Sequence, residues 1–148
     1  MNALTVLIDT DVLLDFLVQR GPFTKNARLI IQKSQEKKFN AFMAAHSITN
    51  IFYVLRRIYT ASERKQLLLD ICRIISVVET GYDLNLNTLN NNDFDDIEDC
   101  LQAECAKAVN ADYILTRNIK DYVHSGIPAI LPEDFLQKMS VLSRGRGK

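Results

Sequence analysis

Short apolar runs that alternate with helical patterns limit the fold of this chain more than any other feature. LTVLI at Leu4 to Ile8 and AFMAA at Ala41 to Ala45 are short and almost wholly apolar, so each predicts a buried strand. Further candidate strands are ISVVE at 75–79, YILT at 113–116 and, between two prolines, AIL at 129–131.

Between these runs, apolar residues recur at the i, i+4 and i+7 spacing of a helix. The three patterns are Phe23, Ala27, Ile30 and Ile31; Ile48, Ile51, Phe52 and Leu55; and Leu67, Leu68, Ile71 and Ile74. Because strands that alternate with helices pair in parallel, this order predicts an α/β domain built on a parallel sheet.

The chain has the length of one domain. Its 148 residues are 47% hydrophobic and 24% charged, which is typical of a globular protein with its own core. We expect a single domain over residues 1–138 and a flexible basic tail at 139–148. The asparagine-rich stretch from Asn85 to Asn92 is expected to form a turn.

Charge and apolar content exclude several classes of protein. Eighteen basic residues balance eighteen acidic ones, so the chain lacks the general positive field that drives unspecific binding to nucleic acid or membranes. It has no signal-peptide pattern and no apolar run near the roughly 18 residues that span a bilayer, so we expect a soluble cytoplasmic protein. Cys72, Cys100 and Cys105 show no zinc-like pairing, and we expect reduced, mostly buried thiols.

An acidic segment, NNDFDDIEDCLQAECA at Asn91 to Ala106, is either a solvated helix start or a cation site. The predicted apolar side of this helix consists of Phe94, Ile97, Leu101, Cys105 and Ala108. Asp99 falls on the other side beside Ala103 and Ala106, whose small side chains allow another element to approach. We therefore expect Asp99 to point into a crevice. The acids that we assign to capping, helix dipole and solvation are Asp93, Asp95 and Glu98.

The predicted sheet indicates where this crevice lies. Open parallel sheets bind ligands beyond the carboxyl ends of their strands. Asp9 directly follows the first predicted strand, so it lies at such an end. We expect the carboxylates of Asp9 and Asp99 to lie close together there.

Three motifs, in this order, resemble the PIN-domain ribonucleases. They are VLIDTDVLLDFL at Val6–Leu17, DIEDCLQAECA at Asp96–Ala106 and ADYILTRNIKDY at Ala111–Tyr122. The resemblance reaches the IPAILPEDFL segment at Ile127–Leu136 and is greatest to toxin-like bacterial members that are paired with antitoxins. It implies a three-layer α/β/α fold with a twisted parallel central sheet, and four acidic positions that hold one or two divalent cations.

On this resemblance, Asp9 and Asp99 are catalytic metal ligands and Asp96 is a helper. Two positions depart from the family pattern, because Asn50 stands where the family has Glu and Asn118 where it has an acid. An asparagine offers a carbonyl oxygen without charge, so both are expected to be weak ligands. The nearby acids that are expected to compensate for them are Asp11 and Asp121.

Carboxylates at these positions suit Mg²⁺ or Mn²⁺, which take oxygen ligands and activate water to attack a phosphodiester. The resemblance therefore implies a metal-dependent endoribonuclease that acts on RNA, with Arg117 and Lys120 against the RNA phosphates. Ser47 is interpreted either as the N-cap of its helix or as a polar group near the metal. His46 and His124 are expected on the surface or in loops.

Two other functions stay open. Asn50 and Asn118 also fit a catalytically degenerate PIN-like module that binds RNA or protein. LIDTDVLL also resembles the D-x-D motif of the haloacid-dehalogenase-like phosphatases, with Asp9 as nucleophile and Asp11 as general acid, although a suitable downstream Lys is lacking. The partners implied by the PIN resemblance are a small antitoxin that enters the acidic crevice and a second copy in a homodimer. The helix at Ile48–Tyr59 is a candidate interface.

Overall fold

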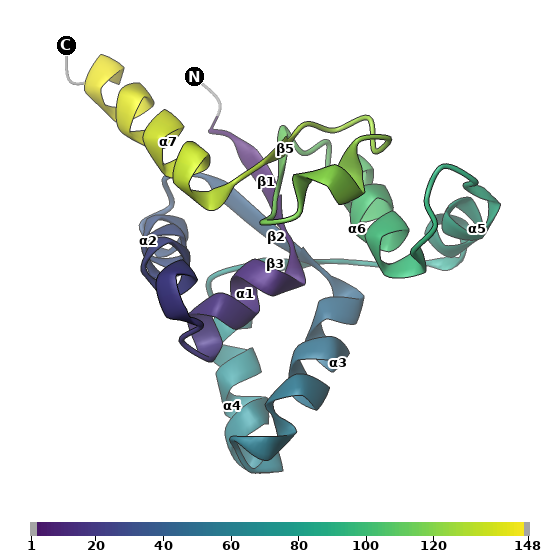
Figure 1. The fold of residues 1–148 in the computed structure, drawn as a ribbon, viewed down its shortest axis with the longest axis horizontal. Coiled ribbons are helices and arrows are strands. Elements are labelled where there is room, and N and C mark those ends of the chain that lie inside the picture. Colours follow the sequence, from purple (N-terminus) through teal and green to yellow (C-terminus); the bar gives the residue numbers. More distant parts are fainter. Residues whose placement is uncertain (1–2, 147–148) are drawn as a thin grey trace.

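In the computed structural model, which describes residues 3–146, five strands form one sheet in the order β3-β2-β1-β4-β5 (Figure 1). The strands are β1 (Thr5–Ile8), β2 (Asn40–Ala44), β3 (Ser76–Val78), β4 (Tyr113–Leu115) and β5 (Ala129–Ile130). Every neighbouring pair is parallel. The predicted parallel sheet is thus confirmed, and each strand begins and ends within one residue of its expected bounds.

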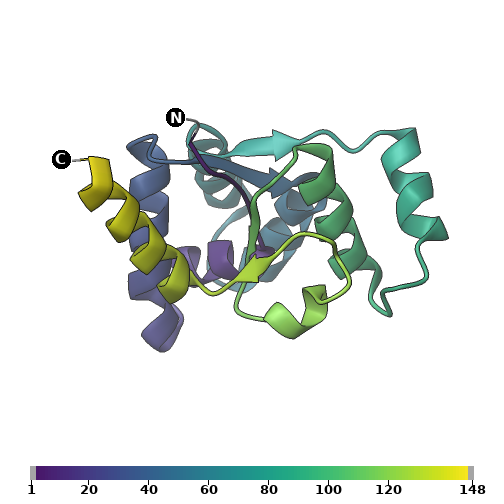
Figure 2. The same ribbon diagram turned by 90° about the horizontal axis from the view of Figure 1, so that it is seen from above.

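Helices cover both faces of this sheet, with α2 and α7 on one side and α6 on the other (Figure 2). The helices of the described residues are α1 (Thr10–Leu17), α2 (Thr24–Gln35), α3 (Ala45–Val54), α4 (Ala61–Cys72), α5 (Tyr82–Asn90), α6 (Ile97–Ala108) and α7 (Pro132–Arg146), with short 3-10 helices η1 (Gly21–Phe23), η2 (Leu55–Arg57) and η3 (Ile119–Tyr122). None of the helices within residues 3–146 combines the length and the apolar character that crossing a membrane requires.

The central strand shows why the domain needs three layers. Val6 and Ile8 of β1 belong to a core cluster shared with α1, α2, α4 and α7, whereas Leu7 belongs to a second cluster against α6. Successive side chains of a strand point to opposite faces, and all three are fully buried. Both faces of the sheet must therefore be covered by helices, which confirms the three-layer α/β/α fold.

Most of the asparagine-rich stretch, residues 85–90, forms a helix and not the predicted turn, whereas Asn91 and Asn92 lie in the connection to α6. Residues 82–90 form α5, which lies outside α6 (Figure 1). Thr88 of α5 is buried, and its backbone carbonyl accepts a hydrogen bond from Cys100 Sγ of α6 at 3.7 Å. Packing against α6 therefore overrides the low helix propensity of asparagine.

The expected flexible tail at 139–148 is wrong for residues up to 146, because α7 continues through Arg146. Met139 and Phe135 of this helix are buried in the core. The Phe135 ring meets the Phe39 ring edge to face, with centroids 5.0 Å apart. This packing places α7 in the same domain as the sheet. Residues 147 and 148 lie outside the described residues.

Candidate functional site

Asp9 stands between β1 and α1, at the carboxyl end of the central strand. Its side chain is 8% exposed, and its Oδ2 accepts hydrogen bonds from Thr116 Oγ1 at 2.8 Å and from Tyr122 Oη at 3.1 Å. Burial raises the pKa of Tyr122, and the charge of Asp9 raises it further, so the phenol keeps its proton. These two donors hold the Asp9 carboxylate in place.

The Asp9 carboxylate lines a cavity of about 340 Å³ into which several loops and helix starts project. The side chains that the sequence predicted for the site and that line this cavity are Asp9, Asp11, Asp99, Asp121, Asn50 and Asn118. Glu98, which we had assigned to solvation, lines it as well. Among the described residues, five carboxylates from α1, α6, η3 and the end of β1 therefore share one space.

Two of these carboxylates, those of Asp9 and Asp99, have raised pKa values. Burial, together with the nearby charges of Asp96, Asp121, Asp9 and Asp11, raises the pKa of Asp99 to about 7. Burial also raises the pKa of Asp9 to about 6. Neighbouring carboxylates that resist ionisation are typical of sites that bind a cation or transfer a proton.

Both asparagines in the cavity donate to a carboxylate. Asn118 Nδ2 donates to Asp11 Oδ2 at 2.7 Å, and Asn50 Nδ2 donates to Glu98 Oε2 at 3.2 Å. An amide has one donor end and one acceptor end. Since the donor ends meet carboxylates, the acceptor that each side chain can offer to another group is its neutral Oδ1.

A buried polar cluster joins three elements beside the acids. The hydroxyl oxygens of Thr10 and Ser47 are 2.7 Å apart, and Gln102 Nε2 donates to them at 3.1 and 3.3 Å. The N-cap interpretation of Ser47 is wrong, because α3 already begins at Ala45. Gln102 was not predicted as a site residue, and the signal for it is a polar residue one helical turn after Asp99.

Asp96, predicted as a catalytic helper, caps α6 and does not line the cavity. Its Oδ1 accepts a hydrogen bond from the backbone N–H of Asp99 at 3.0 Å. The predicted apolar side of this helix is right for Cys105, which is fully buried, but wrong for Ile97, which is 55% exposed, and it missed Ala103 and Ala106, which are fully buried. The small residues let α6 pack closely on the sheet, and this brings Asp99 to the cavity.

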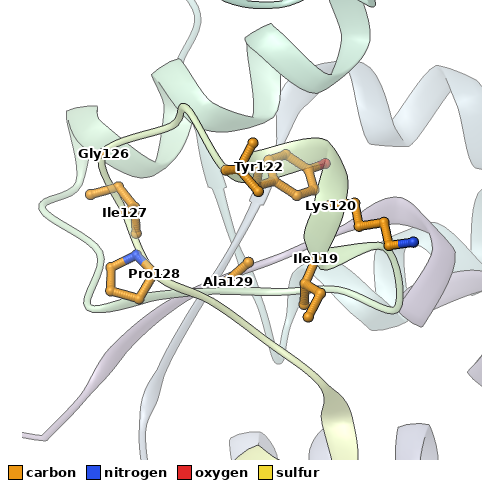
Figure 3. A pocket seen from close by; sticks show the side chains of 8 residues that line it. Ile119, Lys120, Tyr122, Gly126, Ile127, Pro128 and Ala129 are labelled. Atoms are coloured by element: carbon orange, nitrogen blue, oxygen red, sulfur yellow. The ribbon is translucent and has the colours of Figure 1, made fainter.

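Arg117, predicted to contact RNA phosphates, is bound inside the protein. Its guanidinium donates to the carboxylate of Asp15 at 2.7 and 3.3 Å and lies 4.0 Å from the centroid of the Phe23 ring. Lys120 is exposed and lines a neighbouring cavity of about 460 Å³, which Tyr122 also lines (Figure 3).

Arg20 and His46 were not predicted as site residues, but both line the acidic cavity. Among the described residues, Arg20 is the only Lys or Arg in its wall. His46, expected on the surface or in a loop, is half-buried on α3, and burial lowers its pKa. Neither residue belongs to a recognisable motif, because its position depends on how α1 and α3 pack.

Removal of the Arg117 guanidinium, which pairs with the carboxylate of Asp15, is expected to destabilise the fold. Asp15 is 1% exposed, and burial raises the pKa of its carboxyl while Arg117 lowers it. We expect Arg117→Met to lower the free energy of unfolding by about 3 kcal/mol at pH 7, because it leaves a buried charge unpaired. Urea denaturation measures this loss. Lys120→Met is the control at an exposed position, with an expected change within about 0.5 kcal/mol; equal losses in the two variants would contradict the prediction.

The chemistry of the cavity wall fits a hard divalent cation, because carboxylate and amide oxygens are the ligands that Mg²⁺ and Mn²⁺ take. Within residues 3–146, no group of three or more His, Cys, Asp or Glu side chains lies close enough together to hold a metal ion without rearrangement. The buried Oε1 of Gln102 has no hydrogen-bond partner among the described residues, so it is an oxygen that a cation or its water shell can satisfy.

Comparison with known proteins agrees with the motifs. The family model described as PIN domain matches residues 5–120, whereas no curated protein matches the chain. Solved structures that share the fold include DNA-bound VapBC from Salmonella typhimurium, with 11% identity and a TM-score of 0.64 over 87% of this chain and 98% of that chain. VapBC-1 from nontypeable Haemophilus influenzae has 14% identity and a TM-score of 0.62 over 88% and 99% of the two chains. Because the family match covers most of its length, the chain belongs to the PIN domain family.

Proposed function

We propose that this chain is a divalent-metal-dependent endoribonuclease of the PIN-domain type. The observation that carries this proposal is that five carboxylates of the described residues line one cavity at the carboxyl edge of the sheet. Membership of the PIN domain family makes nuclease chemistry the first hypothesis. The raised pKa values of Asp9 and Asp99 support a site whose negative charge a cation balances.

The proposed ligands of Mg²⁺ or Mn²⁺ are the carboxylates of Asp9, Asp11, Asp99 and Asp121, with the amide oxygens of Asn50 and Asn118 as weak ligands. When bound, such a cation supplies an activated water and positive charge against the phosphate. Thr116 and Tyr122 keep Asp9 oriented through their hydrogen bonds to its Oδ2. Asp96 is left out of the ligand set because it caps α6.

Contacts to the RNA backbone are assigned differently from the sequence prediction. Arg20 lines the acidic cavity, so we propose that it contacts a phosphate of the substrate. Arg117 is excluded from this role because its guanidinium is bound to Asp15. Lys120 stays a proposed RNA contact, since it is exposed beside the neighbouring cavity.

We also propose that the chain is the toxin of a toxin–antitoxin pair and forms a homodimer. The solved VapBC and FitAB structures that share its fold, one of them bound to a DNA fragment from the promoter, motivate an antitoxin partner. An apolar groove between α3 and α4, of about 460 Å³ and lined by Ile48, Phe52, Leu68 and Leu69, supports a protein contact on this face.

The two alternatives differ in their support. A haloacid-dehalogenase-like phosphatase needs a lysine, and among the described residues none lines the cavity. The family match to the PIN domain also opposes it. A catalytically degenerate module remains the second candidate, because Asn50 and Asn118 lower the charge of the site.

Cleavage of single-stranded RNA by the purified chain tests the proposal. With Mn²⁺ or Mg²⁺ we expect internal cleavage products, and with EDTA we expect none, because the carboxylates alone supply neither positive charge nor an activated water. p-Nitrophenyl phosphate is the control substrate and should not be hydrolysed. RNA binding without cleavage in Mn²⁺ would favour the degenerate module, and hydrolysis of the ester would favour the phosphatase.

A further inference from the structure

Glu98 differs from Asp93 and Asp95, the other two acids that we assigned to capping, helix dipole and solvation, in where its side chain lies. All three are exposed, but only Glu98 lines the acidic cavity. Its Oε2 accepts the hydrogen bond from Asn50 Nδ2 at 3.2 Å, which connects α6 to α3. A carboxylate that only solvates a helix needs no contact of this kind.

Capping of α6 does not explain the position of Glu98. Asp96 already caps this helix through its bond to the backbone N–H of Asp99. Among the described residues, the only side-chain hydrogen bond of Glu98 is the one to Asn50. The helix dipole favours an acid in the first turn whichever way its side chain points, so the dipole does not account for the contact either.

We propose that Glu98 is a metal-binding residue, which supplies from α6 the carboxylate that α3 lacks at Asn50. This inference rests on the metal-dependent function proposed above. The hydrogen bond holds the charged oxygens of Glu98 beside the neutral Oδ1 of Asn50, so that the pair together offers a charged and a neutral oxygen. The same arrangement recurs at Asn118, whose Nδ2 donates to Asp11.

An independent observation points to a ligand in the same cavity. Gln102, one turn after Glu98 on α6, lines the cavity and is 2% exposed. Its Nε2 donates to Thr10 and Ser47, but its Oε1 has no partner among the described residues. A buried acceptor without a partner calls for a hydrogen-bonding or coordinating group that the chain does not supply, such as a bound water or ion. The carboxylates around it favour a divalent cation over a neutral donor.

Calorimetric titration of the full chain with Mn²⁺ tests the inference. We expect Glu98→Gln to weaken Mn²⁺ binding by about 10-fold or more. Asp95→Asn removes one charge from an exposed position of the same segment outside the cavity wall, and its affinity should stay within about twofold of wild type. The swapped double variant Asn50→Glu with Glu98→Gln should recover most of the lost affinity, because the carboxylate returns to the same wall from α3.

Three results would overturn the inference, and they differ in what they say of the function. If wild type binds Mn²⁺ and Glu98→Gln binds it equally well, Glu98 is not a ligand, while the proposed metal-dependent function stands. If the affinity of Glu98→Gln falls but the swap does not recover it, Glu98 does not replace an acid at position 50. If wild type binds no Mn²⁺, the proposed function fails together with the inference. Urea denaturation without metal confirms that each variant is folded.

Discussion

Asp99→Asn is expected to reduce Mn²⁺-dependent RNA cleavage by at least about 100-fold while the chain stays folded. Loss of a metal ligand removes several kcal/mol of transition-state stabilisation, and about 1.4 kcal/mol corresponds to a tenfold change in rate. The substitution keeps the shape of the side chain and removes the carboxyl of Asp99, whose pKa is raised to about 7 mainly by burial. Without metal, the urea midpoint at pH 8 should therefore equal or exceed that of wild type. Cleavage assays and urea denaturation measure the two effects.

Asp9→Asn should behave in the same way, because an asparagine Oδ1 can still accept the hydrogen bonds of Thr116 and Tyr122. Asp95→Asn is the matched control, since it removes a carboxylate from an exposed position outside the cavity wall. Its cleavage rate should equal that of wild type. Full activity in both Asp9→Asn and Asp99→Asn would show that the cavity is not the catalytic site.

Metal-free wild type is expected to lose stability as the pH rises from about 4 to about 7. The pKa of Asp9 rises from 3.8 to about 6 on folding, and that of Asp99 from 3.8 to about 7. A carboxyl whose pKa is raised in the folded state ionises at a lower pH in the unfolded state than in the folded state. Its contribution to the free energy of unfolding is therefore fully present below pH 3.8 and is lost as the pH rises through the folded pKa. For the well-buried Asp9, about 1.4 kcal/mol per pKa unit makes this loss up to about 3 kcal/mol.

Urea unfolding at a series of pH values measures this loss, with the Asp9→Asn, Asp99→Asn double variant as the control. The slope over this range should be shallower in the double variant. Burial lowers the pKa of His46, which acts in the opposite direction as the pH falls, so the difference between the two proteins isolates the carboxylates. Mn²⁺ should stabilise wild type strongly at pH 8 and little at pH 5, because protons compete with the cation. Identical pH profiles in both proteins would contradict the raised pKa values.

The strand pattern and the position of Asp9 follow from local sequence. Runs such as LTVLI and AFMAA are apolar at every position facing a helix layer, and a strand buried on both faces requires that composition. Asp9 interrupts the first run at its carboxyl end, which in a parallel sheet is the ligand-binding edge. These inferences need only the period of the side chains and the direction of the chain, and the structure confirms both features.

Sequence patterns predicted less well where the outcome depended on long-range contacts. Asn-rich α5 is helical because it packs on α6, and α7 continues past residue 138 because Met139 enters the core. Arg117 looked available for RNA until the fold placed Asp15 and Phe23 against it. In each case the deciding energy comes from burial and pairing between segments far apart in the chain, and no local pattern contains it.

The sequence by itself determined that acids gather at the carboxyl edge of a parallel sheet, since Asp9 and Asp99 could be placed from strand ends and helix periodicity. Only the tertiary structure decided which other side chains share that space. Glu98 reaches the cavity through Asn50 of α3, and Gln102 enters the wall because its amide meets two hydroxyls on other elements. The physical reason is that a helix face becomes a cavity wall only after its neighbours have packed around it, and the sequence of that helix does not contain those neighbours.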